Sequence, residues 1–349
     1  MNKRTEQDIL YIHPPKLPGW VTRKWREAFA SFQVMPMGAV ALANLLREDG
    51  FPVPGLNYAM ELDLDPLFDL RAWLEACPSP LLVVLDLHWI EHSFGTLEVA
   101  RVCKEVYPGV PVAIGGLTAS LYAQEILGEF PQVDYVIRGD AEAGLVGLSR
   151  HLVEGQPDLQ TIPNLSLRIA GQVVENPLTY IAGSDDLEGL DFVSIDFLVH
   201  QEEYYWRQSS RYRQICGHWL CVGRGCRHDC CWCGGSRSVH ERIFGRSKLV
   251  VRSPARLVDN LGRLYQLGVD QAALSHDLAQ PERFGLGHHW NGFLDYYRYC
   301  QCSTEAKDDE AAMKLRGFEM IEYRPLADMF EKWVALCRQL GEDTCLHFP

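Results

Sequence analysis

The sequence predicts an α/β protein with a doubly wound, parallel sheet in its first 154 residues and a smaller α/β domain after residue 212. Three observations support this fold class. Short runs of Val, Ile and Leu alternate with longer segments in which apolar residues recur at helical spacing, as in βαβ units. The short runs are apolar throughout, which is typical of parallel strands buried on both faces. A length of 349 residues agrees with two domains.

Strands and helices alternate along the first domain. Strands are expected at Asp8–His13, Leu81–His88, Pro111–Gly116 and Tyr135–Asp140. Helices are expected at Pro36–Gly50, Thr96–Tyr107, Ala119–Phe130 and Ala141–Val153. Ligands of such sheets bind beyond the carboxyl ends of the strands, so the polar and glycine residues that follow each strand are the first candidates for a site.

Residues 155–212 differ in composition and are expected to form a linker between the two domains. A β-hairpin is expected within it, at Leu165–Ile169 and Gln172–Glu175, because Ala170-Gly171 is a two-residue turn signal. An acidic and aromatic stretch follows the hairpin and leads into the second domain.

The second domain, expected over residues 213–349, begins with a strand, a helix and another strand. These are predicted at Gln214–Val222, Ser253–Leu267 and Gln271–Asp277. Ser253 is a candidate N-cap because Pro254 then occupies the first helical position. After Pro281 the alternation is weak, and one further strand and one helix are expected at Phe318–Tyr323 and Ala327–Leu340.

The chain is acidic overall but basic around a cluster of cysteines. Its net charge is −13, which argues against a general nucleic-acid-binding protein. The stretch Arg207–Arg263 nevertheless contains 12 Lys and Arg residues against three acidic residues. This stretch either offsets thiolate charge and attracts an anionic ligand, or forms a solvated basic surface.

The sequence favours a cytoplasmic protein. The longest apolar run, Leu81–Leu85, is far shorter than the roughly 20 residues that span a bilayer. The N-terminus is charged and has no apolar core of a secretory signal. We therefore expect a reducing compartment, in which clustered cysteines are more often metal ligands or catalytic groups than disulfides.

Six of the 12 cysteines lie within 18 residues of one another. Three of them, Cys226, Cys230 and Cys233, have the spacing C-x3-C-x2-C. Three thiolates on one loop hold three irons of a cubane cluster. The fourth iron then has no protein ligand, and an open coordination position is what allows a metal to contact a substrate.

A structural zinc knuckle is the alternative for this loop. It would use four of the clustered cysteines, or cysteines together with His228 or His218. The cysteine spacing, the aromatic Trp232 and the glycines Gly234 and Gly235 favour the iron–sulfur interpretation.

The loop resembles that of the radical S-adenosylmethionine (SAM) superfamily. The resemblance implies a [4Fe-4S] cluster whose open iron is chelated by SAM, and reductive cleavage of SAM to a 5′-deoxyadenosyl radical. It assigns SAM binding to Trp232, Gly234, Gly235 and Asp277, and it leaves Cys231 as an extra cysteine. It also implies a partial (β/α) barrel, shortened here because only 116 residues follow the third cysteine.

The first 154 residues resemble the Rossmann-like (flavodoxin-like) cobalamin-binding domain that precedes many radical SAM domains. The matching segments are Pro14-Pro15, Pro36-x-Gly38, Leu81–His88, Val112–Ser120 and Val133–Glu142. Glycines in this pattern let a bulky corrin tail approach the end of a strand. The residues that the resemblance assigns to cobalamin binding are His88, Gly115, Gly116, Thr118, Ser120, Arg138, Gly139 and Glu142.

The role of His88 stays open at this point. Asp86-x-His88 resembles part of the D-x-H-x-x-G motif of other cobalamin proteins, in which the histidine ligates cobalt. Glu91 stands where that motif has glycine, so a contact with the lower face of the corrin is a second interpretation. A separate metal site built from Asp86, His88, Glu91 and His92 is a third.

The resemblances together imply a cobalamin-dependent radical SAM enzyme that transfers a methyl group to an unactivated carbon. Its cofactors would be a [4Fe-4S] cluster, SAM and cobalamin. Two other functions fit the residues: a non-catalytic cobalamin or iron–sulfur binding or assembly protein with a degenerate barrel, and a zinc-knuckle interaction protein. The expected partners are a small-molecule substrate, a reductant such as flavodoxin or ferredoxin, and a second chain if one completes the barrel. Neither nucleic acid nor a membrane is expected.

Overall fold

A computed structural model describes residues 8–17, 35–207, 218–226, 236–269 and 272–274. The chain separates into two compact units. Unit 1 contains Met1–Ala182, Ser194–Val199 and Arg237–Ser247, and unit 2 contains Gly183–Val193, His200–Ser236 and Lys248–Pro349. Unit 1 therefore includes a short segment that lies beyond the cysteine cluster in the sequence.

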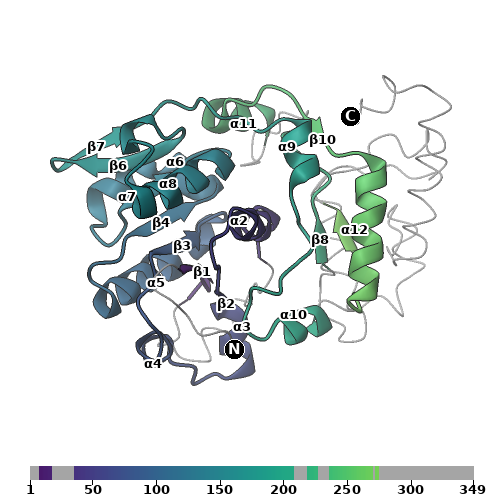
Figure 1. Ribbon diagram of the computed structural model, residues 1–349, viewed down its shortest axis with the longest axis horizontal. Coiled ribbons are helices and arrows are strands. Elements are labelled where there is room, and N and C mark those ends of the chain that lie inside the picture. The colour runs from purple at the N-terminus through teal and green to yellow at the C-terminus, as the bar shows by residue number, and fades with distance from the viewer. Residues whose placement is uncertain (1–7, 18–34, 208–217, 227–235, 270–271, 275–349) are drawn as a thin grey trace. The chain divides into compact units, whose positions relative to one another are not determined.

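A single seven-stranded sheet forms the centre of unit 1, with the strand order β2-β1-β3-β4-β5-β6-β7 (Figure 1). The strands are β1 Ile9–His13, β2 Gly55–Asn57, β3 Leu82–Asp86, β4 Val112–Gly115, β5 Tyr135–Ile137, β6 Leu165–Ile169 and β7 Gln172–Glu175. The first five strands are parallel, and β6 and β7 are antiparallel. The order 2-1-3-4-5 is that of a flavodoxin-like sheet, so the predicted α/β fold class is confirmed.

Helices cover both faces of this sheet. They are α2 Met37–Glu48, α3 Tyr58–Leu64, α4 Leu70–Glu75, α5 Ser93–Val106, α6 Leu117–Leu121, α7 Ala123–Glu129, α8 Glu142–Glu154 and α11 Arg237–Phe244, with short 3-10 turns η1 Ile90–His92 and η2 Leu159–Thr161. Helices α4, α5 and α7 share one hydrophobic core with the sheet. Helices α2 and α8 pack against each other outside that core. The sheet is therefore wound on both faces, as the sequence predicts.

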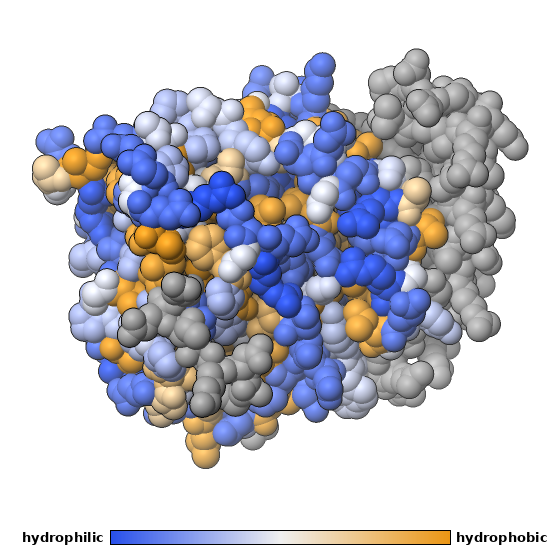
Figure 2. Space-filling model, viewed as in Figure 1, coloured by the Kyte–Doolittle hydropathy of each residue, from blue (hydrophilic) through white to orange (hydrophobic). Residues whose placement is uncertain are grey.

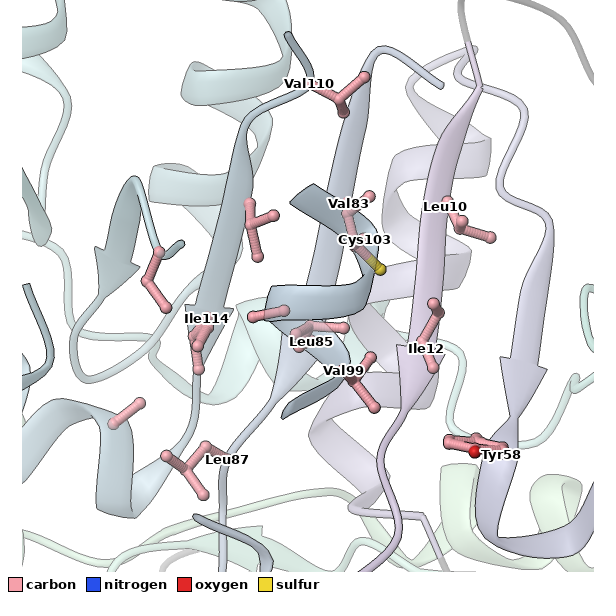
Figure 3. Close-up of a cluster of buried hydrophobic side chains, with 14 of the residues drawn as sticks. Leu10, Ile12, Tyr58, Val83, Leu85, Leu87, Val99, Cys103, Val110 and Ile114 are labelled. Carbon is pink, nitrogen blue, oxygen red and sulfur yellow. The ribbon is translucent and has the colours of Figure 1, made fainter. Parts of the chain in front are cut away.

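Alternate residues of the central strands build the core beneath α5 (Figure 3). Leu10 and Ile12 of β1 and Leu85 of β3 point toward Val99 and Cys103 of α5, and all five are buried. Full burial of a large aliphatic side chain stabilises a protein by about 1.5–3 kcal/mol. Because side chains alternate along a strand, the intervening residues of β1 face the opposite side of the sheet.

Three features of unit 1 differ from the sequence prediction. The hairpin β6–β7, expected in a linker, pairs with β5 and continues the sheet. The helix expected over Ala119–Phe130 is broken at Tyr122 into α6 and α7. In α6 the hydroxyl of Ser120 donates to the carbonyl of Gly116, and this back-bonding bends helices. Short elements β2, α3 and α4 were not predicted, since their few residues show too little periodicity.

Unit 2 contains one clear β/α unit among its described residues. Strands β8 His218–Leu220 and β11 Ala272–Leu274 are parallel, and α12 Pro254–Gln266 connects them in sequence. The predicted N-cap is confirmed, since Ser253 accepts a hydrogen bond from the amide of Arg256 at 3.2 Å. The other elements are α9 Ser184–Gly189, α10 Gln201–Arg207 and the antiparallel pair β9 Gly223–Arg224 and β10 Val250–Val251. The elements predicted at Phe318–Tyr323 and Ala327–Leu340 lie outside the described residues.

A buried arginine stabilises the interior of unit 2. The guanidinium of Arg252 donates to the carbonyl of Cys221 at 3.0 Å and to the side chain of Asn260 at 2.9 Å. It also lies over the ring of Phe192, 4.7 Å from its centre. Buried charges require such partners, so these contacts position the segment between β8 and β9, which precedes the cysteine loop.

The surface is mixed in polarity. On the face drawn in Figure 2, hydrophobic residues are interspersed among hydrophilic ones. Large apolar side chains such as Leu67, Ile90 and Phe94 are exposed. Within the described part of the chain, every helix is too short or too polar to cross a bilayer.

Candidate functional site

The carboxyl ends of β1, β3, β4 and β5 meet at one edge of the sheet. Ile12 pairs with Leu85, so the next residues along each strand, His13 and Asp86, lie side by side. Asp86 in turn pairs with Gly115 of β4. This edge therefore collects the strand-end residues that the sequence singled out, as expected for a parallel sheet.

A buried hydrogen-bonded cluster lies at the end of β1 and β3. His13 Nδ1 donates to the carboxylate of Asp86, at 2.9 Å from Oδ1 and 3.1 Å from Oδ2. The hydroxyl of Tyr11 donates to Oδ1 as well. Burial acts to raise the pKa of Asp86, but the charge and hydrogen bond of His13 and the hydrogen bond of Tyr11 outweigh it, so the pKa lies below its usual value. Asp86 is therefore held as a carboxylate.

A second buried histidine adjoins this cluster. His92 Nδ1 donates to the carbonyl of Pro14 at 3.1 Å, and its ring centre lies 5.5 Å from that of His13. Burial, followed by the charge of His13, lowers the pKa of His92 to about 4. The Nε2 atoms of His13 and His92 are both buried without a hydrogen-bond partner among the described residues. Buried polar atoms without a partner are unusual, so these two nitrogens are candidates to contact an external group.

His88 stands apart from the cluster. Its backbone carbonyl accepts hydrogen bonds from the hydroxyl and the amide of Thr118, at 2.9 and 3.3 Å. Its ring packs edge-on against Trp89, and burial lowers its pKa. Among the described residues, the Asp86 carboxylate accepts hydrogen bonds from His13 and Tyr11 rather than from His88.

The separate metal site considered for Asp86, His88, Glu91 and His92 does not form. Among the described residues, no three His, Cys, Asp or Glu side chains are arranged to hold a metal ion. The reason is that β3 ends at Asp86 and the following turn directs the side chains into different surroundings. Asp86 lies toward His13, His88 toward Trp89 and His92 toward Pro14, and Glu91 is exposed.

The predicted glycine turn lies against the β3 end. Gly116 has φ +116°, and a Cβ there would lie 2.7 Å from the carbonyl oxygen of Leu87. Ser120 braces the turn by donating to the Gly116 carbonyl at 2.7 Å and accepting from the amide of Gly139 at 2.9 Å. The hydroxyls of Thr118 and Ser120 thus donate their hydrogens to backbone carbonyls, and each oxygen has further acceptor capacity.

The other residues assigned to cobalamin by resemblance follow β5. Arg138 donates to the carbonyl of Asn176 and lies 3.6 Å from the Glu175 carboxylate, so it engages the hairpin, and burial lowers its pKa. Gly139 has φ +68°. Glu142 is buried at the first turn of α8. Of these three, Gly139 belongs to the same braced turn system as Gly116.

An ion pair that the sequence did not reveal lies beside this turn. Asp140 pairs with Arg246, and both side chains are almost fully buried. The amide of Ala182 donates to the same carboxylate at 2.8 Å, and Arg246 donates to the Ala182 carbonyl at 2.9 Å. Arg246 follows α11, the helix after the cysteine loop, so this pair anchors that segment within unit 1.

The cysteine loop is described only at its start. Cys226 is partly buried and follows Gly225, which has φ +97° and redirects the chain after β9. Cys221 is buried, and its thiol donates to the Gly223 carbonyl at 3.6 Å. The remaining predicted residues lie outside the described part: His228, Cys230, Cys231, Trp232, Cys233, Gly234, Gly235 and Asp277.

Known proteins have sequences similar to this chain. Residues 28–149 match the B12 binding domain family. The chain is 25% identical over 235 residues to the anaerobic magnesium-protoporphyrin IX monomethyl ester cyclase of Synechocystis sp.. It is also 25% identical over 236 residues to the hopanoid C-3 methylase of Methylococcus capsulatus. These matches cover 65% and 67% of this chain.

A solved structure with the same fold is the radical S-adenosylmethionine methyltransferase TsrM of Kitasatospora setae, with cobalamin and a [4Fe-4S] cluster bound. It superposes with a TM-score of 0.52 at 18% identity, over 78% of this chain and 48% of TsrM. The chain is related to the cobalamin-binding radical SAM enzymes. It spans 42% of the length of the cyclase and 41% of the length of the methylase.

Proposed function

We propose that this protein is a cobalamin-dependent radical SAM enzyme. One combination carries the proposal: a parallel sheet that matches the B12 binding domain family precedes a loop with the spacing C-x3-C-x2-C. The sheet offers a glycine-lined edge for a corrin, and the loop offers three thiolates for a cluster with an open iron. Neither feature alone distinguishes this function from a simple binding role.

The residues at the sheet edge fit cobalamin. Gly116 takes a backbone conformation that favours glycine, and the absence of a side chain lets the turns after β3 and β4 lie close together. Thr118 and Ser120 retain acceptor lone pairs beside that turn. Nearby, two buried imidazole nitrogens have no partner in the described structure. We assign cobalamin to this edge.

The cluster is assigned to Cys226, Cys230 and Cys233. Trp232, Gly234, Gly235 and Asp277 are assigned to SAM on the family pattern. When bound, these groups would supply one-electron cleavage of SAM to a 5′-deoxyadenosyl radical and transfer of a methyl group through cobalamin. The polypeptide's part is to hold the thiolates on one tight loop, to exclude water with Trp232 and to present the substrate carbon.

Methyl transfer to an unactivated carbon is the reaction we favour. Two of the similar proteins are named as a methylase and a methyltransferase, and a third as a cyclase. We further propose a small-molecule substrate and a one-electron donor such as flavodoxin or ferredoxin, because reductive cleavage of SAM consumes an electron that none of these residues supplies.

Anaerobic reconstitution of the full chain with iron, sulfide, SAM and hydroxocobalamin tests the proposal. We expect iron–sulfur absorbance, stoichiometric cobalamin uptake and release of 5′-deoxyadenosine after reduction. Cys230→Ala should abolish the absorbance and 5′-deoxyadenosine but retain cobalamin, whereas Cys231→Ala should retain all three. Zinc without iron and sulfide would instead identify a zinc-knuckle protein. A full cluster that yields no 5′-deoxyadenosine would identify a non-catalytic binding or assembly protein.

A further inference from the structure

We infer that His13 Nε2, oriented by the Asp86 carboxylate, is the axial protein ligand of the cobalt in bound cobalamin. The inference rests on the proposed cobalamin-binding function and adds the identity of the ligand. It differs from the expectation raised by the Asp86-x-His88 spacing, because the carboxylate holds a histidine from another strand.

The hydrogen bonds define which nitrogen of His13 is available. A carboxylate only accepts hydrogen bonds, so Nδ1 carries a hydrogen and donates it to Asp86. Nε2 is then the ring nitrogen whose lone pair can bind a metal. Metal-bound histidines commonly have a carboxylate on their other nitrogen, which fixes the ring and makes it a stronger donor.

The surroundings of Nε2 also point to a ligand. The His13 side chain is fully buried, and Nε2 has no hydrogen-bond partner among the described residues. Burying a polar atom without a hydrogen-bond partner is unfavourable. A ligand that binds Nε2 would remove this cost from the cluster of His13, Asp86 and Tyr11. The corrin ring itself supplies four nitrogen ligands to its cobalt. One imidazole from the protein is therefore enough, whereas a free metal ion would need several protein ligands.

The position of His13 is rigid. A Cβ at Gly95 would lie 1.7 Å from the carbonyl oxygen of Pro15, so the start of α5 packs directly onto the Pro14-Pro15 segment that follows His13. The Tyr11 hydroxyl donates to Oδ1 of Asp86, the same oxygen that His13 approaches at 2.9 Å, and so helps to fix the carboxylate. Metal sites require ligand side chains whose rotamers are fixed by neighbouring residues.

The two other histidines of this edge lack the same support. His92 also has an unpartnered Nε2, but its Nδ1 donates to the neutral carbonyl of Pro14 rather than to a carboxylate. His88 packs against Trp89 and has no carboxylate partner among the described residues. These differences favour His13 as the ligand, and variants at His92 and His88 serve as matched controls.

Electron paramagnetic resonance of the cob(II)alamin-loaded full chain tests the assignment. The unpaired electron of this cobalt state points along the axial bond, so an axial nitrogen splits each cobalt line. With natural nitrogen we expect triplets, and with protein whose histidines carry nitrogen-15 we expect doublets. Triplets in the labelled protein would assign the ligand to the cofactor's own dimethylbenzimidazole. Unsplit lines would indicate water or no ligand. Either result would overturn the inference.

Variants then identify the histidine. His13→Asn keeps an amide near the position of Nδ1 for Asp86 but removes Nε2, so the nitrogen splitting should disappear. His92→Asn and His88→Asn should leave it intact, and loss of splitting in either would overturn the assignment. If His13→Asn does not fold, selective labelling of the wild type still decides whether a protein histidine binds, and retained splitting in both control variants excludes His88 and His92 as that histidine. Failure of the wild type to take up cobalamin contradicts the proposed function itself, whereas uptake without histidine splitting contradicts only this inference.

Discussion

Arg246 and Asp140 form a buried ion pair although 106 residues separate them in the sequence. The pair joins the segment after α11 to the turn at the end of β5, beside the braced glycine turn. The amide of Ala182 also donates to the Asp140 carboxylate, and the Ala182 carbonyl accepts from Arg246. A buried pair with such additional hydrogen bonds specifies where the returning segment docks.

Removing one partner of this pair should release α11. Arg246→Met leaves the Asp140 carboxylate buried without its counter-charge, which costs about 3–5 kcal/mol. We expect faster hydrogen exchange in α11 and in the turn after β5. Arg242→Met, at an exposed position of the same helix, is the control and should change exchange little. Equal effects of the two substitutions would show that the ion pair does not anchor the helix.

The glycine turn should tolerate no side chain. Gly116→Ala places a Cβ 2.7 Å from the Leu87 carbonyl oxygen and forces alanine to φ +116°. We expect a loss of about 1–3 kcal/mol in stability from this backbone conformation and a weaker affinity for cobalamin. Gly109→Ala, where a Cβ meets nothing within 4 Å, should leave both unchanged. Thermal unfolding and equilibrium dialysis with hydroxocobalamin measure the two effects, and wild-type values for Gly116→Ala would contradict the prediction.

The buried His92 should make unit 1 less stable in mild acid. Its folded-state pKa is about 4 against 6.5 in the unfolded chain, so the unfolded state binds more protons in the window between these values. Stability should therefore fall as the pH decreases from about 6.5 to about 4, by up to about 3 kcal/mol. Urea unfolding at several pH values measures this slope. His92→Asn retains an amide for Pro14 and should flatten the slope, and an unchanged slope would assign the acid sensitivity to other groups.

The Asp86 carboxylate should matter for cofactor affinity. Asp86→Asn replaces the acceptor that orients His13 and Tyr11 with a neutral amide. Loss of such a supporting carboxylate typically weakens metal binding by about 10–100-fold. We expect weaker cobalamin uptake and an altered axial splitting in the resonance spectrum. Glu91→Gln, an exposed acid nearby in the sequence, is the charge-matched control. Unaltered uptake and splitting in Asp86→Asn would separate this carboxylate from the cofactor.

The secondary structure of the first domain was predictable to a large extent. Apolar runs such as that at Leu81–His88 and the helical spacing from Pro36 to Gly50 are local patterns, and the structure has β3 and α2 at these places. The pairing of the hairpin β6–β7 with β5 was not predictable from these patterns. Such pairing depends on which strand lies at the edge of the assembled sheet. The hydrophobic periodicity of a single segment carries no information about this.

The sequence by itself determined the alternating α/β order, the glycine turn at Gly115-Gly116 and the C-x3-C-x2-C spacing of Cys226, Cys230 and Cys233, because composition, periodicity and spacing are properties of neighbouring residues. Only the tertiary structure decided which histidine the Asp86 carboxylate holds. The parallel pairing of β1 with β3 places His13 beside Asp86, whereas His88 lies past the strand end in a turn that points its ring toward Trp89. Residues 73 positions apart can share a hydrogen bond only after the sheet has formed.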